Sequence, residues 1–430
     1  MKQNKRPAEQ QMRHIRRDES GRLTIGRHTA TELAERFGTP LYVYSGDGFV
    51  AHYAAFEAAL SELDCVVHYA VKANSSLGVL GLLAKQGAGA DIVSGGELKR
   101  ALSAGITPNK IVFSGVGKTD DEISFALHAG IGQINAESAA ELRHISRIAA
   151  ETGRQAPVAL RVNVNIDPGS HAKISTGQRS TKFGIPVVDG EAAILYRELC
   201  SDPKLSPRGL AVHIGSQLRK LEPFERAYKE LLSLADMLRK EGLDVPMLDL
   251  GGGLGVDYEG DAMPDFGAYG QMVTRIFANQ GYKLGFEPGR SIAADNGVFL
   301  TRTLFIKKGE DKRFIIVDGA MNDLIRPTLY EAFHRIEPAG PPQPEIGLAD
   351  IVGPVCETGD YLGQGRAMPA IAEGEVLAVL SAGAYGAVMM SNYNTRPEAA
   401  EVMIHNGVIH VLRPRRCVDD LLKLEDNPFC

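Results

Sequence analysis

The sequence predicts an α/β fold, a TIM (β/α)8 barrel followed by a C-terminal β-rich domain of sandwich or barrel type. Two observations lead to this prediction. A short apolar strand followed by an amphipathic helical stretch recurs eight times between Val66 and Glu287. After about Asn296 the pattern changes to strand-like runs that are separated by Gly, Pro and Asn turns. A doubly wound open sheet is the weaker alternative for the repeated part.

The N-terminal elements come before the repeat. Residues 1–20 are charged, and we expect them to form a flexible extension. A short strand at 23–25 and a helix at 29–37 follow, and Gly38-Thr39-Pro40 ends that helix. Residues 41–44 are rich in strand formers, and a helical pattern from 48 to 63 leads to the first barrel strand.

The predicted strands are short apolar runs bounded by turn residues. The eight barrel strands are expected at Val66–Lys72, Ala90–Ser94, Ile111–Ser114, Gln133–Asn135, Val158–Val164, Leu210–Ile214, Met247–Leu250 and Lys283–Glu287. Strands of the second domain are expected at Val298–Ile306, Arg313–Val317, Glu375–Leu380 and Val408–Leu412. Pro338–Pro344 is expected to be a stiff surface connector, with a docking segment as the alternative.

Composition indicates a globular enzyme that acts on small molecules. The 430 residues are 44% hydrophobic and 23% charged, with a net charge of -6. Lys and Arg are scattered, which argues against nucleic acid or a membrane surface as the main partner. The five cysteines are widely spaced without a C-x-x-C pair, so we expect neither a disulfide framework nor a metal site. No export signal or membrane-spanning run is visible, and a cytoplasmic location is expected.

Lys72 is the first candidate catalytic residue. It lies in Tyr69-Ala70-Val71-Lys72-Ala73-Asn74, at the end of an apolar run and just before a segment with helical spacing. Partial desolvation at the end of a buried strand suits a lysine amine for Schiff-base chemistry. The alternative is an ordinary lysine whose stem packs along a strand end while its ammonium stays in water.

Gly251-Gly252-Gly253 follows Leu248-Asp249-Leu250, at the position where barrels often bind phosphate. The alternative is simply a tight turn. The next strand ends in Glu287-Pro288-Gly289-Arg290, which adds a glycine and a cation at the same place. Glu287 should therefore face a cation or a protonated ring nitrogen, or else form a structural salt bridge with Arg290.

His213-Ile214-Gly215-Ser216-Gln217 adds an imidazole that can stack on a ring and a hydroxyl for a phosphate. The alternative is a hydrogen-bonded core histidine. Pyridoxal phosphate requires an amine, a phosphate cradle and an acid for its pyridine nitrogen. Lys72, the glycine turn and Glu287 supply these three groups, so the sequence predicts pyridoxal 5'-phosphate as cofactor.

The second domain has two glycine-rich loops with chemically equipped side chains, Cys356–Asp360 and Gly383–Gly386, the latter containing Tyr385. Cys356 could donate a proton, although a free cysteine is more often a small core residue. Arg326 and Tyr330 lie four residues apart and would share one helical face, where together they could hold a carboxylate. The alternative is a surface helix with ordinary polar side chains.

From about Leu23 to Leu424 the chain resembles the fold-type III pyridoxal-phosphate-dependent decarboxylases, and among them most closely the diaminopimelate decarboxylases. The segments His171–Gly177 and Lys182-Phe183-Gly184 look like the version in that branch. The other motifs that carry the resemblance appear in the family's order and spacing: Tyr69–Asn74, His213–Gln217, Gly251–Gly255, Glu287–Arg290, Cys356–Asp360 and Gly383–Gly386.

The resemblance implies a barrel at residues 45–295, a β domain made of residues 21–44 and 296–430, and a homodimer with shared active sites. Lys72 would carry the cofactor, His213 would stack on its ring and Glu287 would keep the pyridine nitrogen protonated. The phosphate would be surrounded by Ser216, Gly251, Gly252, Gly253, Gly289, Arg290 and Tyr385. The part of the substrate that does not react would be held by Arg290, Arg326, Tyr330, Glu357 and Tyr385.

By the same resemblance, Cys356 of the partner subunit would protonate the carbanion after carbon dioxide leaves. The implied reaction is decarboxylation of meso-2,6-diaminopimelate at its D-configured centre to L-lysine, the last step of lysine biosynthesis. One rival is a decarboxylase for another amino acid, such as ornithine, lysine or carboxynorspermidine. Another is a non-catalytic relative that binds pyridoxal phosphate or a partner protein. Arg290 and Arg326 speak against the first rival, and Lys72 with Cys356 against the second.

Overall fold

The computed structural model describes residues 14–167, 182–260 and 263–429. The chain divides into two compact units, one made of His52–Val256 and Ala262–Ser291, the other of Met1–Ala51, Asp257–Asp261 and Ile292–Cys430. We call the first the barrel unit and the second the β unit.

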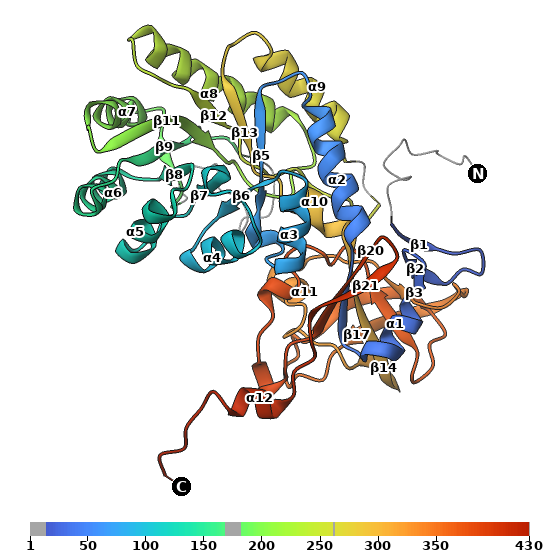
Figure 1. The fold of residues 1–430 in the computed structure, drawn as a ribbon. Helices are drawn as coiled ribbons and strands as arrows, with labels where there is room; N and C mark the ends of the chain where they lie inside the picture. The colour runs from blue at the N-terminus through green and yellow to red at the C-terminus, as the bar shows by residue number, and fades with distance from the viewer. Residues whose placement is uncertain (1–13, 168–181, 261–262, 430) are drawn as a thin grey trace. The chain divides into compact units, whose positions relative to one another are not determined.

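The barrel unit contains a closed parallel barrel of eight strands (Figure 1). Around the barrel the order is β9-β11-β12-β13-β5-β6-β7-β8, and the pairing of β8 with β9 closes it. The strands are β5 (Cys65–Ala70), β6 (Gly89–Ile92), β7 (Ile111–Phe113), β8 (Gln133–Ala136), β9 (Ala156–Asn163), β11 (Leu205–Val212), β12 (Met247–Asp249) and β13 (Lys283–Phe286). A two-residue strand, β10 (Ile185–Pro186), also pairs with β9.

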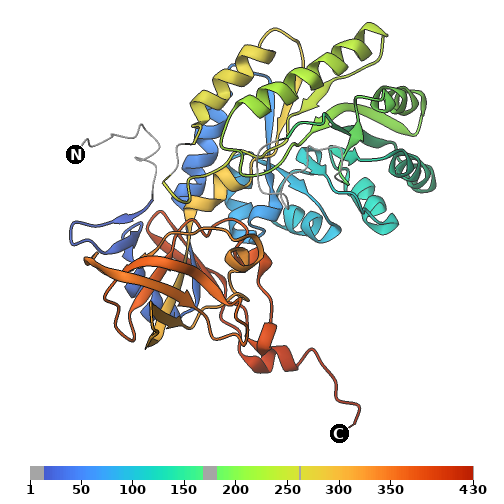
Figure 2. The ribbon, with the colours of Figure 1, turned by 180° about the vertical axis from the view of Figure 1, so that it is seen from behind.

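Helices surround these strands on the outside, as both views of the ribbon show (Figures 1 and 2). They are α3 (Leu77–Lys85), α4 (Gly95–Ser103), α5 (Asp120–Ala129), α6 (Ala139–Thr152), α7 (Glu191–Ser201), α8 (Glu222–Lys240) and α9 (Phe266–Phe277). The local sequence explains several of their starts, because Ser94, Ser138 and Asp265 accept hydrogen bonds from first-turn backbone N–H groups. Thr119 and Glu122 form a reciprocal capping box at the start of α5.

The β unit is built on β14 (Gly297–Lys308), which pairs with β4 (Leu41–Ser45), β15 (Arg313–Val317) and β19 (Val376–Val379). The sheet order is β18-β17-β15-β14-β4-β20-β21, with β16 beside β19. The remaining strands of this sheet are β16 (Ile336–Pro338), β17 (Glu345–Val352), β18 (Tyr361–Pro369), β20 (Ala400–His405) and β21 (Val408–Arg413).

Alternate residues of β4 and β14 form one core cluster of the β unit, and both strands are buried on their other face as well. Leu41 and Val43 on β4 and Val298 and Leu300 on β14 are fully buried in one cluster with Val402 of β20. The N-terminal elements join this cluster: β1 (Ile15–Arg17), β2 (Leu23–Ile25), β3 (His28–Thr29) and α1 (Ala30–Phe37). Helix α2 (Gly46–Ala59) then leads from β4 into the barrel unit.

The predicted fold class is confirmed, and each of the eight predicted barrel strands is present with its ends shifted by a few residues. Lys72 is not part of β5, since it lies in the 3-10 turn η2 (Val71–Ala73) directly after it. Strands β1, β3, β10, β16, β17, β18 and β20 were not predicted. Of these, β17 and β18 contain glycines and register shifts, which interrupt the apolar alternation on which the sequence-based prediction depends.

Candidate active site

Lys72 lies just beyond the C-terminal end of β5, the end at which barrel enzymes carry out their chemistry. Its Nζ donates to Asp91 Oδ2 at 2.6 Å. Asp91 lies in β6, next to β5, and its side chain is completely buried. The side chain of Lys72 is 35% exposed to solvent. The amine is therefore accessible while a buried carboxylate fixes its direction.

Glu287 follows β13, and its backbone N–H donates to Gly251 O at 2.8 Å. The side chain is 8% exposed, and Oε1 has no hydrogen-bond partner among the described residues. Burial, together with the nearby carboxylates of Asp249 and Asp91, raises the pKa of Glu287 well above its usual value. Lys72 and Arg161 oppose this effect only in part. A buried carboxyl group thus presents an oxygen that can accept a hydrogen bond.

His213 comes directly after β11 and carries a neutral ring. Gly252 N donates to His213 Nδ1 at 3.2 Å, which leaves the ring proton on Nε2. Burial and the positive charges of Arg161 and Lys72 lower the pKa of His213 well below its usual value. An uncharged imidazole is suited to stacking on an aromatic ring.

The turn Gly251-Gly252-Gly253 fits only glycines. A Cβ on Gly251 would lie 2.4 Å from Val212 O, and one on Gly252 would lie 2.2 Å from Glu287 O. Gly251 also has a positive φ of 66°. The turn is therefore packed against the segments that carry His213 and Glu287, and without side chains its backbone can approach an anion closely.

The Glu287–Arg290 segment also borders the lysine turn. Ala70 N donates to Pro288 O at 3.1 Å, and a Cβ on Gly289 would lie 3.0 Å from the Cβ atoms of Ala70 and Ala73. Arg290 donates through Nε and Nη2 to Ser216 Oγ at 3.3 and 3.1 Å. These contacts bring two predicted phosphate ligands together.

A cavity of about 20 Å³ lies among the predicted residues of the barrel unit. It is lined by Lys72, Ser114, Asn135, Arg161, Ala211, Val212, His213 and Glu287. The structure therefore brings together the lysine, the histidine and the glutamate that the sequence singled out.

The β unit carries the remaining predicted residues. Cys356 and Glu357 are exposed on a loop between β17 and β18. Asn394 Oδ1 accepts from Cys356 N at 3.1 Å, and Tyr393 Oη donates to Glu357 Oε1 at 2.5 Å. Asp360 closes the loop by accepting from Val355 N at 2.6 Å. Hydrogen bonds therefore hold the loop to residues 393 and 394 and also within itself.

Arg326 and Tyr330 begin and end the short helix α11 (Arg326–Tyr330), so the predicted helix exists. Arg326 is buried, its Nη1 donates to His334 Nε2 at 2.6 Å, and its guanidinium lies 4.9 Å from the ring centre of Tyr258. His334 Nδ1 in turn donates to Leu380 O at 2.9 Å, which fixes Nε2 as the acceptor. Two aromatic side chains therefore set the direction of this arginine.

Tyr385 lies in the loop after β19 with a positive φ of 56°. A Cβ on Gly383 would lie 2.0 Å from Ala293 O, and one on Gly386 would lie 2.8 Å from the ring of Tyr42. The glycines on either side of Tyr385 are therefore required by close packing. Tyr385 between them has a backbone conformation that is uncommon for a residue with a side chain.

The sequence-based reasoning missed Asp91, Asp249, Arg161, His334 and Asn394. Asp91 and Asp249 had a detectable signal, because each is a charged residue inside an otherwise apolar strand. His334 and Asn394 had none, since their roles depend on contacts that the chain makes only when folded. The predicted His171–Gly177 motif lies outside the described residues. Gly184, just after it, donates to Glu137 Oε2 at 3.2 Å.

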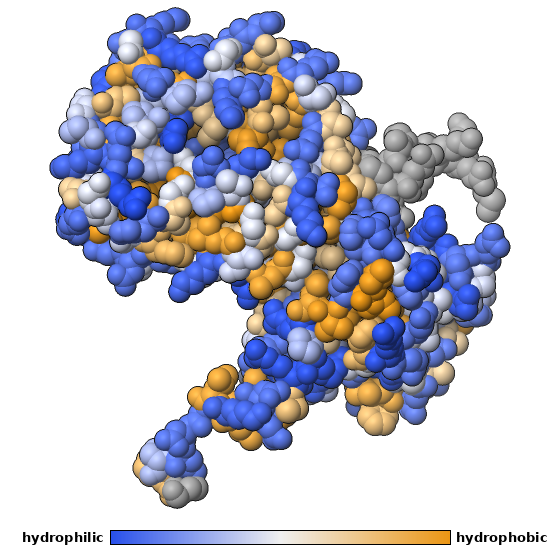
Figure 3. All heavy atoms as spheres, viewed as in Figure 1, coloured by the Kyte–Doolittle hydropathy of each residue, from blue (hydrophilic) through white to orange (hydrophobic). Residues whose placement is uncertain are grey.

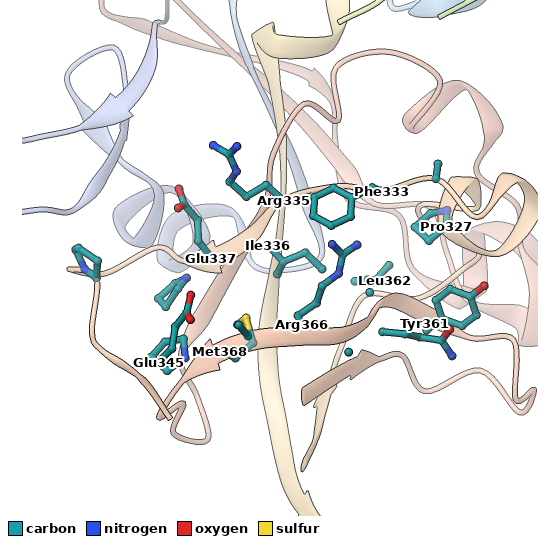
Figure 4. A pocket seen from close by; sticks show the side chains of 18 of the residues that line it. Pro327, Phe333, Arg335, Ile336, Glu337, Glu345, Tyr361, Leu362, Arg366 and Met368 are labelled. Carbon is teal, nitrogen blue, oxygen red and sulfur yellow. The ribbon is translucent and has the colours of Figure 1, made fainter. Parts of the chain in front are cut away.

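A larger cavity of about 850 Å³ lies wholly within the β unit (Figure 4). Arg335, Glu337, Glu345 and Arg366 are among its polar lining residues, and Arg366 stacks on Phe333 at 3.5 Å from the ring centre. None of the predicted site residues lines it. We therefore assign the chemistry to the strand ends of the barrel unit, where a buried acid, an amine and a neutral imidazole meet.

Comparison with known proteins decides the family. Residues 47–294 match the pyridoxal binding domain of pyridoxal-dependent decarboxylases. The diaminopimelate decarboxylase of Zymomonas mobilis is 45% identical over 95% of this chain and 97% of its own length. That of Pseudomonas aeruginosa is 49% identical over 91% of this chain and 94% of its own. The chain belongs to the diaminopimelate decarboxylase family.

Solved structures of the family agree with this assignment. The diaminopimelate decarboxylase of Helicobacter pylori in complex with L-lysine aligns with a TM-score of 0.88 at 40% identity, covering 92% of this chain and 98% of that one. That of M. jannaschii in co-complex with L-lysine aligns with a TM-score of 0.92 at 34% identity, covering 97% and 99%.

The cofactor of the family is pyridoxal phosphate, and the residues present fit it. An accessible amine, a turn of three glycines and a buried carboxyl oxygen without a partner among the described residues lie at one end of the barrel unit. The role of each residue toward the cofactor and the substrate stays a prediction.

Proposed function

We propose that this enzyme decarboxylates meso-2,6-diaminopimelate to L-lysine and carbon dioxide with pyridoxal phosphate as cofactor. The observation that carries the proposal is that the accessible Lys72 and Glu287, whose Oε1 has no partner among the described residues, line one cavity at the C-terminal end of the barrel. Lysine-bound family structures support the choice of reaction.

Lys72 holds the cofactor covalently, and Asp91 keeps its amine directed toward the site. When bound, pyridoxal phosphate supplies a ring that withdraws electrons from the carbon that loses carbon dioxide. Glu287 would face the ring nitrogen and keep it protonated, since its Oε1 has no partner among the described residues. His213 would stack on the ring as a neutral imidazole, without adding a competing charge.

The phosphate would be held by the glycine turn. Gly253 would offer its backbone N–H, whereas the N–H groups of Gly251 and Gly252 already donate to Asp249 and His213, so these two glycines would serve by leaving room for an anion beside the backbone. Arg290 and Ser216, which already contact each other, supply a cation and a hydroxyl. Gly289 and Tyr385 complete this set as predicted phosphate contacts.

The end of the substrate that does not react is a second carboxylate with its own amino group. Arg326 suits the carboxylate because its guanidinium is buried and held in direction by His334 and Tyr258. Arg290, Tyr330, Tyr385 and Glu357 are the other groups that we assign to this end. The requirement for this carboxylate makes diaminopimelate the preferred substrate over lysine or ornithine.

Cys356 donates the proton that replaces the lost carboxyl group, and it does so from the partner subunit of a homodimer. Cys356 is exposed on a loop that a hydrogen bond to Asn394 holds in place, which supports a role at the surface of its subunit. The β unit also has apolar surface where β20 and β21 lie (Figures 1 and 3), and Val408 and Val411 of β21 are 53% and 54% exposed. Exposed apolar surface of this kind is typical of protein contacts.

We also assign the enzyme to the cytoplasm. Cys65, Cys200, Cys356 and Cys417 are free thiols, which is typical of a reducing compartment. Within residues 14–167, 182–260 and 263–429, none of the helices is long and apolar enough to cross a bilayer.

Carbon dioxide release tests the proposal across a panel of amino acids: meso-diaminopimelate, LL-diaminopimelate, lysine, ornithine and arginine. We expect rapid release from meso-diaminopimelate alone. A preference for ornithine or lysine would replace the proposed substrate, and a protein that binds pyridoxal phosphate but releases nothing would be a non-catalytic relative.

A further inference from the structure

A buried carboxyl group, Asp249, lies directly beneath the glycine turn. It is the last residue of β12 and is 1% exposed. Its Oδ1 accepts from Gly251 N at 3.0 Å, and its Oδ2 accepts from Gln133 Nε2 at 3.3 Å. Asp249 thus supports the turn that we assign to the phosphate, although it is too deeply buried to reach an anion itself.

The same carboxyl group is hydrogen-bonded to the side chain of Glu287. Asp249 pairs in register with Gly285 on β13, and Glu287 lies two residues further along, so both side chains point to one face. A Cβ on Gly285 would lie 3.2 Å from Asp249 Cγ, and glycine at this position therefore leaves room for the carboxyl group. The Asp249 side chain therefore contacts both the glycine turn that we assign to the phosphate and Glu287, which we assign to the ring nitrogen.

Two carboxyl groups in contact in a buried place cannot both be ionised at moderate cost. Burial raises the pKa of both groups, and that of Glu287 well above its usual value. Asp249 accepts hydrogen bonds from Gly251 and Gln133, whereas Glu287 Oε1 has no partner among the described residues, so Asp249 is the better stabilised of the two as an ion. Glu287 is then the member that holds the proton.

The other charged groups around Asp249 and Glu287 do not allow both carboxyl groups to be ionised. Asp91 is paired with Lys72, and Arg161 is paired with Glu137 at 2.9 Å. His68 Nδ1 donates to Lys110 O at 2.9 Å, and burial lowers the pKa of the ring, so His68 is neutral.

We propose that Asp249 is a positioning residue that shares one proton with Glu287, so that the pair presents a single negative charge to the ring nitrogen of the cofactor. This inference rests on the proposed function. When a ring N–H donates to Glu287 Oε1, the shared proton moves from Glu287 to Asp249. One O–H bond breaks and another forms, so the pair keeps one proton. Through Gly251, the same side chain sets the position of the phosphate turn.

Infrared spectroscopy of the cofactor-free protein tests the shared proton directly, because a protonated carboxyl group has its own C=O stretching band. Burial is the main cause of the raised pKa of Glu287, and the charge of Asp249 is the next. Asp249→Asn removes that charge, so the band of protonated Glu287 should disappear at a lower pH than in the wild type. The asparagine can still accept from Gly251 N. Glu287→Gln should remove the band altogether, since Asp249 then stays ionised.

We expect Glu287→Gln to lose the intensity of one protonated carboxyl group, and Asp249→Asn to lose it at a lower pH than the wild type. Asp323→Asn in the β unit calibrates that intensity below neutral pH, because burial raises the pKa of Asp323 to about 7. Undiminished intensity in Glu287→Gln, or an unchanged pH dependence of the band in Asp249→Asn, would overturn the proposal.

Titration of the cofactor-free protein with pyridoxal phosphate tests the positioning role. Asp249→Asn should keep its affinity within about threefold, because it imitates the protonated acid. Asp249→Ala should lose about ten- to a hundredfold, since Gly251 and Glu287 lose a buried partner. An equal loss in both variants would contradict the role. Failure of the wild type to bind pyridoxal phosphate would refute the proposed function but leave the infrared result readable.

Discussion

Replacing Arg326 by methionine tests substrate recognition, because it removes one guanidinium group and keeps a stem of similar length. Arg326 is 6% exposed, donates to His334 at 2.6 Å and lies against Tyr258. Such a preorganised and largely desolvated fork should form a strong charge-assisted contact with the remote carboxylate of diaminopimelate.

The expected loss of catalytic efficiency follows from the unpaired substrate carboxylate that the Arg326→Met substitution leaves. In the variant, the substrate carboxylate enters a buried place without its cation, and truncating one member of such a pair costs about 2 to 5 kcal/mol. The value of kcat/KM for diaminopimelate should then fall by about thirty- to several-thousandfold. The wild type should reject lysine by about 10⁴-fold or more, because lysine leaves the arginine donors unpaired. The variant should discriminate far less between the two.

Steady-state kinetics with both substrates measures this effect. The absorption band of the cofactor attached to Lys72 should be unchanged. Arg366→Met is the matched control, since Arg366 is another arginine of the β unit that stacks on an aromatic ring, here that of Phe333. The control should retain wild-type kinetics. An Arg326→Met enzyme with undiminished kcat/KM for diaminopimelate would refute the recognition of the remote carboxylate by this residue.

Three further predictions concern other parts of the molecule. Lys72→Ala should not retain pyridoxal phosphate after borohydride reduction and denaturation, and retention would show that another lysine holds it. Mixing inactive Lys72→Ala and Cys356→Ala chains should recover about a quarter of wild-type activity if subunits exchange at random, whereas no recovery despite proven exchange would place both residues in one chain's site. The pKa of Asp323 is raised to about 7, so its ionisation in the unfolded chain destabilises the fold progressively from about pH 4 up to pH 7. Asp323→Asn should therefore raise the Tm at pH 8 but not at pH 4, and calorimetry showing the same change at both pH values would contradict the assignment.

The barrel could be predicted from the sequence because its parallel strands are buried on both faces and read as short apolar runs. Active-site residues of a barrel lie at the C-terminal ends of its strands, so the ends of these runs predicted Lys72, His213 and Glu287 as site residues. The β unit was less predictable, since β17 and β18 contain Gly347, Gly363 and Gly365, which interrupt the alternation.

Supporting residues were harder to predict than the residues they support. Asp249 and Asp91 act through neighbours that lie far away in the sequence, such as Gln133 and Lys72. The charge state of Glu287 likewise depends on its burial and on the nearby Asp249, whose position is set by the register of β12 against β13. Sequence patterns identify which side chains are present at strand ends, whereas proton positions depend on contacts between strands.

The most direct test of the proposed reaction follows one carboxyl group. The pyridoxal-phosphate-loaded wild-type enzyme is incubated with meso-diaminopimelate whose carboxyl carbon at the D-configured centre carries a ¹³C label. Our account predicts that the label leaves entirely as carbon dioxide and that the product is unlabelled L-lysine. Label retained in lysine, or no carbon dioxide from a protein that has bound its cofactor, would contradict it.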